Sequence, residues 1–118
     1  MRQDRNLKML KANADEAAAL IRLLANGKRL LVLFELMAYC EVSVGLLADT
    51  VGLSRSALSQ HLAKLRAEGL VETRRESQMI FYRLSPNIRV RRMLDLIFSG
   101  MVAIVGVYVV RKDVTGVL

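Results

Sequence analysis

The chain has 118 residues, 53% of them hydrophobic and 25% charged, a composition that predicts one folded domain over residues 1–118 and excludes an intrinsically disordered protein. The formal net charge of +7 favours a polyanionic partner. A single cysteine excludes an internal disulfide, and the N-terminal segment lacks the apolar stretch of a signal peptide, so a cytoplasmic location is expected.

The positive charge is concentrated in one part of the chain. Residues 54–92 hold nine basic and three acidic side chains, whereas residues 12–53 carry a net negative charge. Proteins that bind nucleic acids have such a local basic surface. The alternative is that the excess of lysine and arginine only keeps a small protein in solution.

Two helices are predicted before residue 40. Apolar residues over positions 14–24 follow a helical period, and the pattern ends at Asn26 and Gly27, residues that favour helix termini. The segment 28–39 repeats the same period. The apolar positions expected to face the core are Ala17, Leu20, Ile21, Leu24, Leu30, Leu33, Phe34 and Met37.

Two shorter helices are predicted next, separated by a turn. Ser43 can cap a third helix that extends to Val51, after which Gly52 turns the chain. Ser54 can cap a fourth helix that ends at Gly69, since glycine is common just after a helix. The apolar stripe of this fourth helix consists of Leu58, Leu62 and Leu65.

After Gly69 the apolar residues alternate with polar ones, which is typical of β-strands. Two such stretches flank the segment 74–78, so a hairpin with a charged tip is predicted. Ser85 and Pro86 then open a last helix, because proline fits the first helical position. The predicted fold is mainly α with a two-stranded β-hairpin, in the order α-α-α-α-β-β-α.

Residues 96–110 form an uncharged stretch of fifteen residues. A membrane-spanning helix needs roughly 20 apolar residues, with a lower limit near 17. Apolar residues on all sides of a helix would also suit burial against both its own domain and a second subunit. A membrane-attached regulator anchored through residues 96–110 is therefore the alternative to a protein that works as a dimer.

The third and fourth helices form the pattern of a helix-turn-helix unit, whose second helix lies in the major groove of DNA. With the leucine stripe facing the core, the opposite side of the fourth helix carries residue types that read bases. Arginine can pair with guanine, glutamine with adenine, and serine with bases or phosphates. A merely solvated helix face is the alternative. The predicted base-reading residues are Arg55, Ser56, Ser59 and Gln60.

Enzymatic activity is not expected. Ser59 and His61 are two residues apart on a helix, so their side chains point in different directions. His61 is the only histidine of the chain, and a catalytic triad would need other residues to orient its base. No glycine-rich phosphate-binding loop is present in the sequence.

The segments "ANGKRLLVLFEL" and "VSVGLLADTVGLSRSALSQHLAKLRAEGLVETRRESQMIFYRL" resemble the ArsR/SmtB family of bacterial winged helix-turn-helix repressors, particularly the branch that contains HlyU, BigR and NolR. The resemblance covers about residues 14–98. It implies a homodimer that represses transcription by occupying a near-palindromic operator in double-stranded DNA. The DNA-reading unit would span about 43–84, and dimerisation helices would span about 7–26 and 86–110.

The resemblance also implies roles for individual residues. Positions 55, 56, 59 and 60 match the DNA-reading positions of the family, although several relatives carry glutamine where this chain has Arg55, so the operator sequence does not follow from the family. The hairpin would be the wing. The predicted DNA backbone and wing contacts are Lys64, Arg74, Arg75, Ser77 and Gln78. The predicted dimer interface consists of Leu94, Ile97, Phe98 and Met101.

No metal or cofactor is expected. Metal-sensing relatives often carry a cysteine where this chain has Ser43, and the last helix offers only one carboxylate, Asp95, towards a second family site. Sulfur-responsive relatives use two cysteines, and the first position is Phe34 here. Cys40 is a candidate redox thiol, although a lone cysteine is more often packed as a small apolar residue. The inducer is not defined by the sequence.

Overall fold

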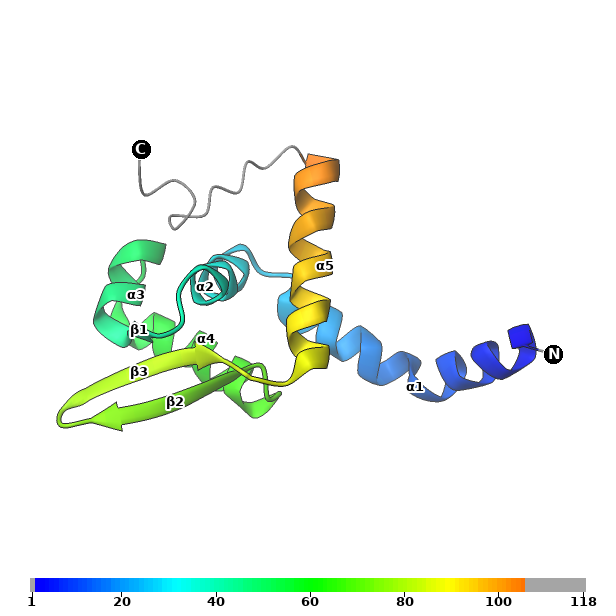
Figure 1. Cartoon of the computed structure of the whole chain (residues 1–118), viewed down its shortest axis with the longest axis horizontal. Helices are drawn as coiled ribbons and strands as arrows, with labels where there is room; N and C mark the ends of the chain where they lie inside the picture. The colour runs from blue at the N-terminus through cyan, green and yellow to red at the C-terminus, as the bar shows by residue number, and fades with distance from the viewer. Residues whose placement is uncertain (1, 106–118) are drawn as a thin grey trace.

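The computed structural model describes residues 2–105 and confirms the predicted helix-rich architecture with a hairpin. Figure 1 shows a compact body from which the first helix projects, with the last helix standing upright beside the base of the hairpin. The overall dimensions are 53 × 32 × 22 Å. The elements are α1 (Arg2–Leu24), α2 (Gly27–Ala38), β1 (Val42–Ser43), α3 (Val44–Val51), α4 (Arg55–Ala67), β2 (Val71–Glu76), β3 (Met79–Leu84) and α5 (Ile88–Val105).

The core lies where α2, α3 and α4 meet the sheet and α5. The predicted stripe of α4, namely Leu58, Leu62 and Leu65, is fully buried, which confirms the helical period. On α2, Leu33 is buried as predicted. The α2 prediction was incomplete, because α2 packs between other elements and also buries a second set of side chains. That set is Val32 and Leu36.

The sheet has three strands rather than two. The short strand β1 pairs antiparallel with β3, so the strand order is β1-β3-β2. Two residues are too few to show an alternating pattern, and the pairing of Val42 with Tyr82 depends on the tertiary fold. The hairpin turn is formed by Ser77 and Gln78, and Ser77 has a positive φ of 56°. The predicted tip residue Arg74 lies within β2 instead.

Two helix starts differ from the sequence prediction. Asn26 does not end α1 but caps α2, where its side chain accepts a hydrogen bond from the backbone N–H of Arg29. The helix α5 begins at Ile88, two residues after Pro86. At this start the side chain of Asn87 accepts a hydrogen bond from the backbone N–H of Arg89. An asparagine side chain can accept from an unpaired N–H in the first turn of a helix, and a proline side chain cannot.

The helix α1 is longer and less buried than predicted. Leu24 is buried, but Ala17 and Ile21 are exposed. The helix projects from the body (Figure 1), so little of the chain covers its apolar side. That side also carries the exposed residues Leu7 and Leu10. The exposed apolar positions recur every three or four residues, as they do on a helix that packs against a partner.

In the part of the chain that the structure describes, none of the helices combines the length and apolarity that crossing a membrane requires. Residues 106–110 of the predicted anchor lie outside the described residues.

Candidate nucleic-acid interface

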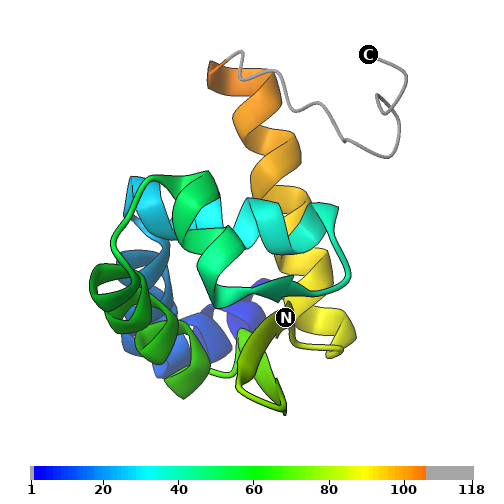
Figure 2. The ribbon, with the colours of Figure 1, turned by 90° about the vertical axis from the view of Figure 1, so that its left-hand side faces the viewer.

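The turn between α3 and α4 sets the position of α4. Gly52 adopts a left-handed conformation with φ of 72°, which glycine tolerates without strain. The backbone N–H of Leu53 then donates to the carbonyl of Ala48 over 3.0 Å. Ser54 caps α4 as predicted, and its hydroxyl accepts from the N–H of Ala57 over 3.1 Å. Figure 2 shows α3 and α4 together with the hairpin on one side of the molecule.

The outer face of α4 is open to solvent along its first two turns. The four predicted base-reading side chains are all exposed, while the leucine stripe on the opposite side is buried. A face with this arrangement can enter a groove without disturbing the core. The exposed set is Arg55, Ser56, Ser59 and Gln60.

Arg55 lies back against α3. A Cβ atom added at Gly45 would approach Nη2 of Arg55 to 2.7 Å, so the guanidinium occupies space that only glycine leaves open. The contact involves the far end of a long, exposed side chain. In this conformation the guanidinium of Arg55 lies beside the start of α3.

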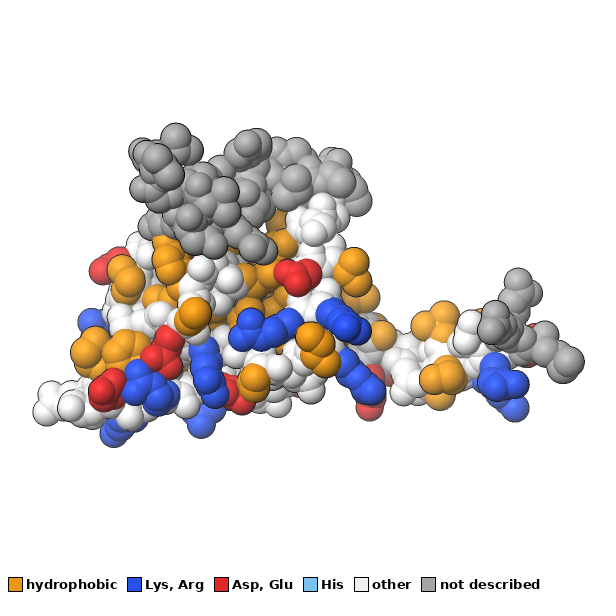
Figure 3. All heavy atoms as spheres, viewed as in Figure 1, with side chains coloured by type: hydrophobic (Ala, Val, Ile, Leu, Met, Phe, Trp, Pro, Cys, Tyr) orange, Lys and Arg blue, Asp and Glu red, His pale blue; other side chains and the backbone are white. Residues whose placement is uncertain are grey.

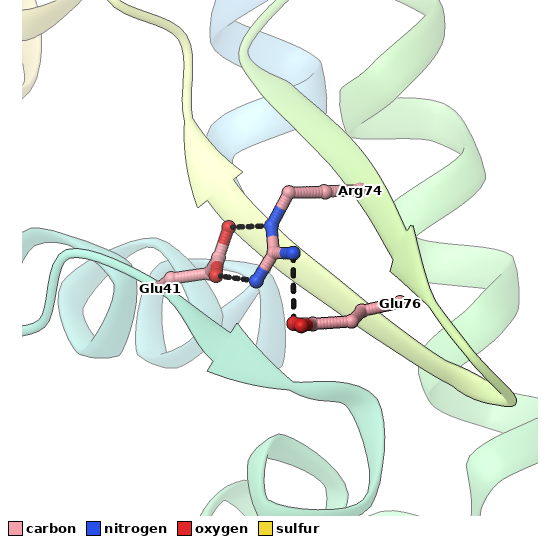
Figure 4. Close-up of polar contacts among 3 residues, drawn as sticks. All are labelled: Glu41, Arg74 and Glu76. Atoms are coloured by element: carbon pink, nitrogen blue, oxygen red, sulfur yellow. Dashed lines mark hydrogen bonds and ion pairs between the residues drawn. The ribbon is translucent and has the colours of Figure 1, made fainter.

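The wing residues fall into two groups. Arg75, Ser77 and Gln78 are exposed near the turn of the hairpin. Arg74 instead uses its guanidinium within the chain, where it binds Glu41 and Glu76 (Figure 4). The same guanidinium lies over the ring of Phe81. The prediction that Arg74 and Arg75 act alike did not consider Glu41, which is distant in sequence.

These ion pairs alter the ionisation of the groups involved. The hydrogen bonds from Arg74 hold the pKa of the Glu41 carboxyl below its ordinary value. The same carboxylate, together with Glu76, raises the pKa of Arg74 above its already high value. Both shifts favour the charged forms of Glu41 and Arg74 and so strengthen the ion pair between them.

Basic side chains gather on the side of the molecule that carries the hairpin. Figure 3 shows them along the lower half of this face, over the hairpin and the start of α5, with acidic side chains among those of the hairpin. Lys64 on α4 is exposed and, with Arg22 and Arg29, lines a shallow pocket beside the end of α1. Glu68 contributes a negative charge to the same pocket.

His61 joins α4 to the start of α2. Its Nδ1 accepts a hydrogen bond from Nε of Arg29 over 3.1 Å, and Nη1 of Arg29 donates to the carbonyl of Leu23 over 3.0 Å. Partial burial lowers the pKa of His61, and the charges of Arg29 and Lys64 lower it further. The imidazole is thus held in its neutral form, in which Nδ1 can accept this bond.

We expect this contact to make stability depend on pH. Because the pKa of His61 is lower in the folded chain than its ordinary value of 6.5, the unfolded chain binds the proton more readily. The contribution of His61 to the free energy of unfolding should be fully present above about pH 6.5 and be lost progressively as the pH falls below it. Urea unfolding at several pH values should show a smaller fall for His61→Gln. Equal pH dependence in the two proteins would contradict the assignment.

The predicted dimer residues need correction. Leu94 is fully buried and Phe98 is 7% exposed, and both belong to the chain's own core. The rings of Phe98 and Phe34 contact edge to face at 5.5 Å between centroids. Ile97 and Met101 are only partly buried against the same core. The prediction is wrong for Leu94 and Phe98, because several sides of this helix are apolar and the side that faces the core cannot be told from the spacing alone. For Ile97 and Met101 it stays a prediction.

The remaining candidate, Cys40, is exposed, so the interpretation of a packed apolar cysteine is wrong. Its thiol lies between the end of α2 and β1. Among the described residues, no three or more His, Cys, Asp or Glu side chains come together in a group that could hold a metal ion.

Comparison with known proteins identifies the family. Residues 20–73 match the family described as "Bacterial regulatory protein, arsR family". The transcriptional activator HlyU of Vibrio cholerae serotype O1 is 46% identical over 92 residues, which cover 78% of this chain and 83% of that protein. The chain belongs to the ArsR family. This confirms the resemblance seen in the sequence, and the protein is a winged-helix transcriptional regulator.

Two further relatives support this assignment. The nodulation protein NolR of Rhizobium meliloti is 56% identical over 70 residues, which cover 59% of this chain and 57% of that protein. The crystal structure of the transcriptional repressor BigR from Xylella fastidiosa has a TM-score of 0.69 at 33% identity, over 87% of this chain and 95% of that one. Both the sequence and the fold of this chain are therefore similar to those of known regulators.

Proposed function

We propose that this ArsR-family regulator is a cytoplasmic homodimer without enzymatic activity, which represses transcription by occupying a near-palindromic operator. The observation that carries the proposal is the outer face of α4, where Arg55, Ser56, Ser59 and Gln60 are exposed above a buried leucine stripe. A helix placed in this way after a tight turn enters the major groove, where these side chain types distinguish bases.

The proposal divides the chain into a reading unit and a dimerisation unit. The reading unit spans about 43–84 and contains α3, α4 and the hairpin. Dimerisation uses the segments 7–26 and 86–110, of which residues 106–110 lie outside the described part of the chain. Within the described residues, the exposed apolar side of α1 and the exposed Leu96 of α5 support a partner surface better than Leu94 or Phe98. Two copies would then present two α4 helices to adjacent half-sites.

Contacts to the DNA backbone are assigned to residues flanking α4. Lys64 lies further along the same helix, and Arg75, Ser77 and Gln78 lie at the end of the wing. Such contacts position the protein without reading bases. Arg75 has no ion pair within the described part of the chain, so its charge is available to a phosphate.

Repression is favoured over activation because it requires DNA binding alone. HlyU is named an activator and BigR a repressor, so relatives of both kinds resemble this chain. Occupying an operator requires only DNA binding, which one small domain can provide. No metal or cofactor is included in the proposal, and the exposed Cys40 remains a candidate redox thiol for an effector that acts on DNA binding.

The proposal is tested by selecting bound sequences from random double-stranded DNA. We expect a near-palindromic motif with half-sites about one helical turn, or a multiple of it, apart. Gln60→Ala should relax the preference at one position per half-site, at a cost of about 1 to 3 kcal/mol. The control Arg75→Ala should weaken binding to all sequences alike. A selection that enriches no motif would contradict the proposal, and equal loss on every sequence for Gln60→Ala would remove its base-reading role.

A further inference from the structure

Arg74 makes more contacts than any other charged side chain of the hairpin. Its Nη2 and Nε bind the two carboxylate oxygens of Glu41 at 2.6 and 3.1 Å, and its Nη1 binds Glu76 at 2.9 Å. The guanidinium carbon lies 4.9 Å from the centre of the Phe81 ring, which belongs to the residue directly opposite Arg74 in β3. All three nitrogens and the stacking face of the guanidinium are therefore engaged within the chain.

The contact with Glu41 connects two separate parts of the fold. Glu41 immediately precedes β1, and Ser43 at the end of β1 caps α3. Arg74 lies in the distal half of β2, two residues from Glu76 at the end of that strand. Figure 4 shows the guanidinium reaching from the hairpin to the segment before β1. The ion pair thus ties the wing to the first helix of the helix-turn-helix unit.

Other contacts hold the hairpin at its base and as far as the middle of β3. Val71 and Leu84, which are paired at the base, are buried, whereas residues 74–79 are exposed. The strand β1 adds only two paired residues to β3. Ser43 in β1 lies opposite Phe81, which is also the residue opposite Arg74. Strand pairing with β1 therefore ends at the level of Arg74, and the contact with Glu41 is made where the exposed end of the hairpin begins, so it affects where the turn lies.

The local charge argues against a phosphate contact by Arg74 itself. Two carboxylates surround one guanidinium, so the cluster repels an approaching phosphate. If Arg74 turned to DNA, Glu41 and Glu76 would lose their partner close to the negatively charged backbone, at a cost that rises as water is excluded.

We propose that Arg74 is a positioning residue, which fixes the wing against α3 through Glu41 so that Arg75, Ser77 and Gln78 meet the DNA backbone. This inference rests on the proposed DNA-binding function and adds a residue role to it. It replaces the expectation that Arg74 touches DNA. The ion pair contributes little to the free energy of unfolding, because the side chain of Arg74 is 48% exposed and that of Glu41 is 27% exposed. Its loss is expected to change DNA affinity, because it sets the position of the wing.

The second ion pair of the hairpin provides a matched control. Arg83 and Glu72 interact at 2.9 Å across β3 and β2, with both side chains exposed. They lie opposite one another within the hairpin and do not connect it to α3. Glu41→Ala and Glu72→Ala remove the same charge from the same side of the molecule, so any difference between them reports on the tie to α3.

The test measures the affinity of full-length protein for its selected DNA motif by fluorescence anisotropy. We expect Glu41→Ala to bind about two- to fivefold more weakly than Glu72→Ala. Arg74→Gln should lose as much DNA affinity as Glu41→Ala does. The double variant should lose no more affinity than either single variant, because the two residues act as one unit. Thermal unfolding of each variant checks that the fold is retained.

A Glu41→Ala variant that binds DNA as tightly as Glu72→Ala, or more tightly, would overturn the inference. If Arg74 contacts phosphate, removing Glu41 frees it and removes a repulsive charge, so Glu41→Ala would bind at least as tightly as Glu72→Ala. Arg74→Gln would then also reduce the salt dependence of binding by about one phosphate contact. Wild-type protein that binds no motif at all would overturn the proposed function, and this inference with it.

Discussion

Replacing Leu62 with alanine is expected to lower the free energy of unfolding by about 2 to 5 kcal/mol. Leu62 is fully buried in the middle of α4, between Leu58 and Leu65. Truncating it removes apolar contacts and leaves a cavity beneath the helix that carries the reading face. Because native domains of this size are only marginally stable, we expect a substantial unfolded fraction at physiological temperature and a corresponding loss of DNA binding.

Urea denaturation of Leu62→Ala and of Ser59→Ala measures this effect. Ser59 lies on the same helix but is exposed, so its substitution should change the free energy of unfolding by no more than about 0.5 kcal/mol. Equal stability of the two variants would show that α4 is not packed through this leucine stripe.

A glutamate at Leu96 is expected to separate the dimer and to lower operator affinity by about 100-fold or more. Leu96 is 74% exposed on α5, and a partner surface there would bury it. An unpaired carboxylate in such an interface costs several kcal/mol, and a monomer can hold only one half-site at a time. Ile97 and Met101 are poorer positions for this test, because they also pack against the chain's own core.

Analytical ultracentrifugation decides the oligomeric state. The control is Leu46→Glu, since Leu46 is 60% exposed on α3, outside the helices assigned to dimerisation. We expect this control to remain a dimer. A Leu96→Glu variant that sediments as a stable dimer and retains its affinity would place the partner surface elsewhere.

The elements that local chemistry specifies were predicted well from the sequence. Ser43 and Ser54 cap α3 and α4 as expected, because a cap depends on a few neighbouring residues. The leucine stripe of α4 followed from its period alone, and the exposed positions 55, 56, 59 and 60 followed from the stripe. The candidate reading face could therefore be derived without a structure.

Features that depend on distant residues could not be predicted in this way. The strand β1 exists through its pairing with β3, and the contact of Arg74 with Glu41 joins residues 33 positions apart. Asn26 was ambiguous because asparagine suits either end of a helix. The division of α5 between core and surface likewise required the packed structure, since its residues 93–98 include apolar side chains on both sides.

The exposed apolar side of α1 is a candidate surface for a partner subunit. Leu7, Leu10 and Ile21 are 50%, 61% and 66% exposed, on a helix that projects from the body (Figure 1). An apolar side of this kind is costly in water and is expected to be covered in the working protein. In the proposed homodimer a second copy would cover it, and the same copy would supply the second α4 for a palindromic site.

If α4 reads a specific DNA sequence, the protein should distinguish between two duplexes of equal length and composition. One carries the selected motif and the other a scrambled version of it, and affinity for each is measured at about 0.15 M salt, where the Debye length is roughly 8 Å. We predict that the motif is bound at least about 10³-fold more tightly. Equal affinity for the two duplexes would contradict the claim and leave only non-specific attraction to a basic protein.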